Sequence, residues 1–129
     1  MTKEHIFAAF AHNIACVDGS LAEEEVKRIY MLASANNLEI SAVTEALKKE
    51  CIHPSNLKEL ADQMSDEDKD FAFFAAKRIS MADGKIGTKE LKKIHSFCEL
   101  FGWGSQYATI EYIELLQANP SLLVEGVDF

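Results

Sequence analysis

Hydrophobic residues recur every three or four positions along nearly the whole chain, which is the spacing of one face of an α-helix. No segment shows the strict alternation and β-branched enrichment of a strand. The pattern therefore predicts an all-α protein of about seven helices. The stripes are Ile6, Phe7, Phe10, Ile14 and Val17; Val26, Ile29, Tyr30 and Ala33; Ile40, Val43 and Leu47; Leu57, Leu60 and Ala61; Phe71, Phe74, Ala75 and Ile79; Leu91, Ile94, Phe97, Cys98 and Phe101; and Ile110, Ile113 and Leu116.

From these stripes we expect one contiguous core. Its predicted members are Phe10, Ile14, Ile29, Phe74, Ile79, Ile94 and Phe97. Breaks in the helical pattern fall at Asp18-Gly19, Asn36-Asn37, His53-Pro54, Ser65-Asp66, Asp83-Gly84 and Gly102 to Ser105. The connections are short and contain no low-complexity linker, which indicates a single domain over residues 1–129.

Two helix starts have a sequence signal of their own. Ser65 is followed three residues later by Asp68, which is typical of an N-cap with acidic residues in the first turn. Pro54 favours the first position of the fourth helix, because proline has no N–H to leave unpaired there.

The chain contains an internal repeat. Residues 14–38 align without a gap to residues 79–103, at an offset of 65. This match predicts an internal duplication, with halves of approximately 1–64 and 65–129 related by a pseudo-two-fold axis. Identical pairs are Ile14/Ile79, Asp18/Asp83, Gly19/Gly84, Glu25/Glu90, Lys27/Lys92 and Ile29/Ile94.

Each copy has the pattern D-G-x-(L/I)-x-x-x-E, and the acids in it support two interpretations. In the first, Asp accepts backbone amides of the turn and Glu stabilises the helix N-terminus, so both are only helix caps. In the second, the two-fold brings the loops together and Asp18, Glu25, Asp83 and Glu90 converge. Four carboxylates would repel one another, and a hard divalent cation such as Ca²⁺ or Mg²⁺ would relieve that repulsion.

An independent EF-hand site is a poor match to either copy. The Gly and Glu fit positions six and twelve of such a loop. However, Ile14 or Ile79 would then stand at position one, and Cys16 or Met81 at position three. Both acidic ligands are missing from both copies.

The motif resembles the signature of the tellurite-resistance TerB-like family. The similarity lies in Ala82-Asp83-Gly84-Lys85-Ile86 with Glu90, in the helix running to Phe101-Gly102-Trp103, and in a first copy, Val17-Asp18-Gly19 with Glu25. The resemblance implies a duplicated helical domain of about seven helices in the cytoplasm. It also implies that the four acids bind a divalent metal. The resemblance further implies that the protein is not an enzyme. It implies instead that the protein binds partner proteins in a stress-response complex, which can be associated with a membrane.

Composition and charge narrow the function further. The formal net charge of −8 disfavours nucleic acid and anionic lipid as partners. No apolar run approaches a membrane span, no signal-peptide stretch begins the chain, and a cytoplasmic location is expected. We find no phosphate loop or nucleophile–base spacing, and so expect no catalysis.

Cys16, Cys51 and Cys98 each fall in a helical pattern and are predicted to be buried reduced thiols.

Overall fold

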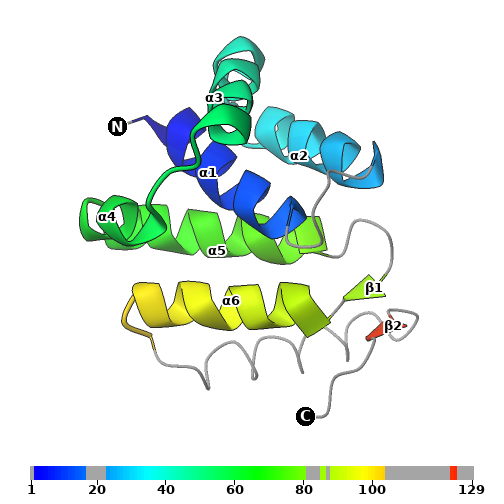
Figure 1. The fold of residues 1–129 in the computed structure, drawn as a ribbon. Helices are drawn as coiled ribbons and strands as arrows, with labels where there is room; N and C mark the ends of the chain where they lie inside the picture. The colour runs from blue at the N-terminus through cyan, green and yellow to red at the C-terminus, as the bar shows by residue number, and fades with distance from the viewer. Residues whose placement is uncertain (1, 17–22, 81–84, 87, 104–122, 125–129) are drawn as a thin grey trace.

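The computed structural model describes residues 2–16, 23–80, 85–86, 88–103 and 123–124. The all-α class is confirmed, because these residues form six helices (Figure 1). The helices are α1 (Lys3–Ala15), α2 (Glu23–Ala35), α3 (Ile40–Ile52), α4 (Leu57–Asp62), α5 (Asp66–Ser80) and α6 (Thr88–Leu100). The last predicted helix, with Ile110, Ile113 and Leu116, lies outside the described residues.

The described residues also contain one pair of very short strands, which the sequence pattern did not predict. Strand β1 (Lys85–Ile86) pairs in parallel with β2 (Leu123–Val124), and Lys85 stands opposite Leu123. A strand of two residues is too short to show an alternating pattern. Its partner also comes from a distant part of the chain, so no local sequence signal marks the pair.

Helices α1 and α5 occupy the centre of the arrangement (Figure 1). They make the most extensive helix–helix contact, closely followed by α1 with α3. Helix α2 contacts both central helices, and so does α6. Helix α4 contacts α1 and α6.

All six helices contribute to one hydrophobic core. Its centre includes Phe10, whose ring packs edge-on against that of Phe97 at a centroid distance of 5.0 Å. The same ring is tilted against that of Phe101, at a centroid distance of 5.4 Å. Six of the seven predicted core residues are buried, namely Phe10, Ile14, Ile29, Ile79, Ile94 and Phe97.

The prediction for the seventh, Phe74, is wrong. Its side chain is 38% exposed, and the Arg78 guanidinium lies 5.3 Å from its ring centroid. The buried side of α5 instead contains Ala72, Phe73, Ala75, Ala76, Ile79 and Ser80. At 100° per residue this set leaves position 74 on the opposite side of the helix. Phe73 points inward instead, and its ring centroid lies 5.5 Å from that of Trp103.

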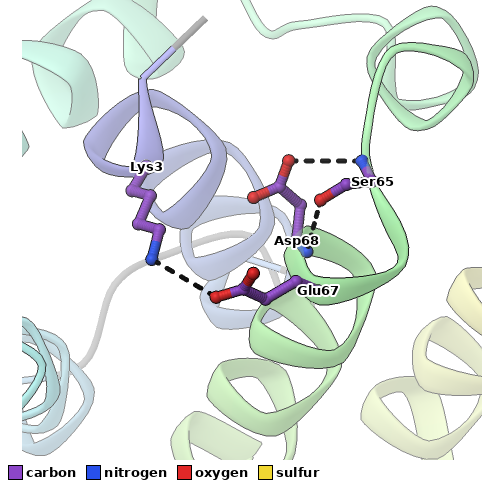
Figure 2. A network of polar contacts seen from close by, with 4 residues as sticks. All are labelled: Lys3, Ser65, Glu67 and Asp68. Atoms are coloured by element: carbon purple, nitrogen blue, oxygen red, sulfur yellow. Dashed lines mark hydrogen bonds and ion pairs between the residues drawn. The ribbon is translucent and has the colours of Figure 1, made fainter.

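The predicted cap of α5 is confirmed. The Ser65 Oγ accepts a hydrogen bond from the Asp68 N–H at 3.1 Å, and the Asp68 carboxylate accepts one from the Ser65 N–H at 3.3 Å (Figure 2). These reciprocal bonds form a capping box. Lys3 of α1 lies 3.8 Å from Glu67 in the same turn, but both side chains are largely exposed, so this ion pair adds little stability.

Helix α4 begins later than the position of Pro54 suggested. Its N-cap is Asn56, whose Oδ1 accepts hydrogen bonds from the N–H groups of Lys58 and Glu59 at 3.1 and 3.2 Å. Asparagine satisfies two otherwise unpaired amides, which proline cannot do. Pro54 therefore lies in the connection before the helix.

The ends of α2 and α6 have the same geometry. Asn37 and Gly102 have positive φ angles of 59° and 77°. The following N–H groups donate back across the turn, from Leu38 to the Ala33 carbonyl at 2.9 Å and from Trp103 to the Cys98 carbonyl at 3.0 Å. Both ends are Schellman motifs, with Asn in one and Gly in the other at the left-handed position.

Candidate metal site

Glu25 and Glu90 occupy matching positions in the two helices that carry them. Both α2 and α6 contain 13 residues, and each Glu is the third residue of its helix. Both side chains are half-buried. The prediction that each Glu lies in the first turn is therefore confirmed.

Neither of these glutamates lacks an interaction partner. A carboxylate in the first turn of a helix is stabilised by the helix dipole and by the unpaired N–H groups there. This position is compatible with both sequence interpretations, since a capping acid and a metal-binding acid can occupy the same turn.

The other two predicted ligands, Asp18 and Asp83, lie outside the described residues. In the sequence, Asp18 comes after α1 and before α2, and Asp83 comes after α5 and before β1. Among the residues that the structure describes, no group of three or more His, Cys, Asp or Glu side chains could hold a metal ion.

Next to Glu25, the exposed side of α2 carries a shallow depression. Glu24, Lys27, Arg28 and Met31 line it. Its walls carry both charges, and the Met31 side chain is 54% exposed. Mixed charge and shallow shape do not define a ligand class.

A pair of reactive side chains that the sequence pattern did not predict lies at the end of α3. Cys51 is exposed, and its Sγ lies 3.4 Å from Nε2 of His12. The prediction of a buried thiol is wrong for Cys51, and Cys16 is only partly buried, whereas Cys98 is buried as predicted. The spacing of residues in α3 carries a signal for the exposure of Cys51. Val43 and Leu47 point inward, and the next inward position of the helix is that of Glu50, so Cys51 lies toward solvent.

Glu50 is the charged residue that takes this inward place, with only 3% of its surface exposed. Its carboxylate accepts a hydrogen bond from the Ser55 N–H at 2.8 Å and another from the Ser55 hydroxyl. These two bonds replace the water that burial removes from the carboxylate. Glu50 therefore fixes the turn that follows α3.

Comparisons of the chain with protein-family models, with curated proteins and with solved structures find no match. Within the described part of the chain, none of the helices has the length and apolar character needed to cross a membrane.

Proposed function

We propose that this chain is a non-enzymatic, TerB-like stress-response module that binds a divalent cation, Ca²⁺ or Mg²⁺, and interacts with partner proteins. The proposed ligands are Asp18, Glu25, Asp83 and Glu90. The observation that carries the proposal is the matching position of Glu25 and Glu90 in two helices of equal length.

The same proposal includes an internal duplication. Helices α2 and α6 begin at Glu23 and Thr88 and end at Ala35 and Leu100, so both bounds differ by the offset of 65 found in the sequence. Helices α1 and α5 end at Ala15 and Ser80, again 65 residues apart. The left-handed residues that close α2 and α6 have the same separation.

Contacts between the halves support a pseudo-two-fold arrangement. Helix α2 packs on α5, and its counterpart α6 packs on α1. The equivalent isoleucines are buried in both copies, with Ile14 and Ile79 at 0% exposure. Two hairpins related in this way would place their connecting loops at symmetric positions.

Chemistry makes a hard cation the best fit to this set of side chains. Carboxylate oxygens are the preferred ligands of Ca²⁺ and Mg²⁺. The cation would offset the mutual repulsion of four negative charges in a chain that already carries a net charge of −8. We expect the protein to act in the cytoplasm, with proteins rather than nucleic acid as partners.

A metal titration of the chelator-treated full chain tests the proposal. At a hundredfold excess over Kd, a cation that binds only the folded state stabilises it by about 2.7 kcal/mol, so the melting temperature should rise. Glu25→Gln and Asp83→Asn should each abolish that rise, because each replaces a charged oxygen by a neutral one. The matched controls are Glu24→Gln and Glu99→Gln, which remove the same charge from exposed positions on the same two helices.

The alternative is a helical protein-interaction module in which the acids only cap helices. The first-turn position of Glu25 and Glu90 favours it, because that position is stabilising without any metal. This alternative predicts no change of melting temperature with Ca²⁺ or Mg²⁺. It also predicts that Asp83→Ala lowers stability to the same extent with and without the cation, which would refute the metal proposal.

A further inference from the structure

The contact between Cys51 and His12 joins the last turns of two different helices. His12 lies in the last turn of α1, Cys51 lies in the last turn of α3, and Sγ and Nε2 are 3.4 Å apart. Helices α1 and α3 pack extensively against each other. The core therefore holds together two side chains that are distant in the sequence.

The chemistry of this pair differs from that of an isolated thiol. The thiolate is the nucleophilic form of cysteine, and an imidazole within hydrogen-bonding distance can accept the thiol proton. Cys51 is also the most accessible of the three cysteines, since Cys16 is partly buried and Cys98 is completely buried. Selective thiol chemistry needs an accessible sulfur and a neighbour that stabilises the thiolate, and the imidazolium formed when His12 takes the proton supplies the second.

We propose that Cys51 is a site of reversible mixed-disulfide formation with low-molecular-weight disulfides, and that His12 is the proton acceptor that activates it. In the step, His12 Nε2 takes the proton of the Cys51 thiol. The Cys51 Sγ attacks one sulfur of the disulfide, so that a new S–S bond forms and the original S–S bond breaks. The departing thiolate takes the proton from His12, and one small thiol is released.

The surroundings of Cys51 can accommodate the added group. Ile52 is 72% exposed, and His53 is exposed as well. An adduct on Cys51 can therefore extend into solvent without entering the core. The proposal is independent of the metal site, because Glu25 and Glu90 lie on α2 and α6.

The first test uses the full chain with oxidised glutathione and follows each cysteine by peptide mass spectrometry. We expect Cys51 to be modified at least about tenfold faster than Cys16 or Cys98, because it is exposed and has the His12 imidazole within reach. Dithiothreitol should release the adduct, and Cys51→Ser should remove the fast phase. Equal rates at the three cysteines would overturn the proposal.

The second test isolates the role of His12. His12→Gln should slow the modification of Cys51 by at least about tenfold, because the positioned proton acceptor is lost. The control is His5→Gln, which changes a half-buried histidine on the same helix and should leave the rate unchanged. An unchanged rate in a folded His12→Gln protein would refute the activation by His12.

A third measurement needs no variant. Urea unfolding removes both the burial of the chain and the contact with His12, so the unfolded rate is that of an ordinary accessible thiol. A thiol that is merely exposed reacts in the folded chain no faster than in the unfolded chain. Activation by His12 requires Cys51 to react faster when folded, by several-fold, while Cys98 reacts more slowly. A folded rate for Cys51 at or below the unfolded rate would contradict the proposal.

Discussion

At the scale of single residues, Ile94 and Phe74 show how strongly burial depends on helix face. Ile94 has no exposed surface, whereas Phe74 is 38% exposed. We expect Ile94→Ala to lower the free energy of unfolding by about 2–5 kcal/mol, because it leaves a cavity in the core. Urea denaturation followed by circular dichroism measures this loss. Phe74→Ala, although it removes more atoms, should cost less, and an equal loss would contradict the assigned orientation of α5.

Glu50 provides a second prediction at this scale. Glu50→Ala removes the acceptor for both the N–H and the hydroxyl of Ser55. We expect a loss of about 1–3 kcal/mol in the free energy of unfolding, the usual cost of leaving partly buried donors unpaired. The matched control is Glu45→Ala on the same helix, where the exposed ion pair with Lys48 spans 3.7 Å. That pair should contribute less than about 1 kcal/mol, and similar losses for the two variants would contradict the proposed role of Glu50.

The same residues show where sequence reasoning at this scale succeeds and where it does not. Periodicity found the apolar residues that a helix must bury, such as Ile14, Ile29 and Ile94. It did not find Glu50, because a carboxylate is buried only when specific donors surround it, and those donors come from the following turn. Because Glu50 takes the buried position in that turn of α3, the neighbouring Cys51 is exposed, and the prediction of a buried thiol is wrong.

At the scale of elements, the shared geometry at the ends of α2 and α6 gives a discriminating test at Gly102. Its φ of 77° is strained for a residue with a Cβ, although a Cβ there would meet no atom within 4 Å. Gly102→Ala should therefore cost about 1 kcal/mol through the backbone alone. Gly102→Asn should cost less, because asparagine tolerates this conformation and already occupies the equivalent position, Asn37.

Thermal or urea unfolding of the two Gly102 variants measures the difference. The reverse change, Asn37→Gly, serves as the control and should be neutral or stabilising, because it removes a Cβ from the same positive φ. A larger loss for Gly102→Asn than for Gly102→Ala would contradict the equivalence of the two helix ends.

Most elements were predictable because their boundaries have local physical causes. The breaks at Asn36-Asn37 and at Ser65-Asp66 coincide with a left-handed residue and a capping box. The start of helix α4 was misplaced because Pro54 suits the first position of a helix, whereas the N-cap is Asn56, two residues later. The β1–β2 pair was not predicted, because two residues of strand depend on tertiary pairing alone.

At the scale of the whole molecule, the net charge of −8 leads to a prediction about salt. Screening of like charges should raise the melting temperature when NaCl increases from about 20 mM to about 200 mM, because the Debye length falls to below about 10 Å. Differential scanning fluorimetry measures the shift. Choline chloride should act equally, since the effect needs no coordination. A fall in melting temperature would show that attractive ion pairs outweigh the general repulsion.

This prediction also affects the test of the candidate metal site, because a divalent cation screens surface charge in addition to binding carboxylates. The metal titration is therefore made at constant ionic strength.

The sequence could place the four acids in two equivalent motifs, and it located Glu25 and Glu90 correctly within their helices. It could not determine whether the two loops meet, because that distance depends on how the hairpins pack and not on any local pattern.

The central contact between α1 and α5 has a consequence for how the chain reaches this structure. Residues that are neighbours in that contact are separated by much of the sequence, so the largest helix–helix contact is non-local. The hairpin of α1 and α2 formed alone would leave Phe10 without Phe97 and Phe101, the two rings of the other half against which it packs. Loop-closure entropy must be overcome before these rings meet. Folding should therefore be cooperative across both hairpins, and slower than in a bundle whose helices pack only on their sequence neighbours.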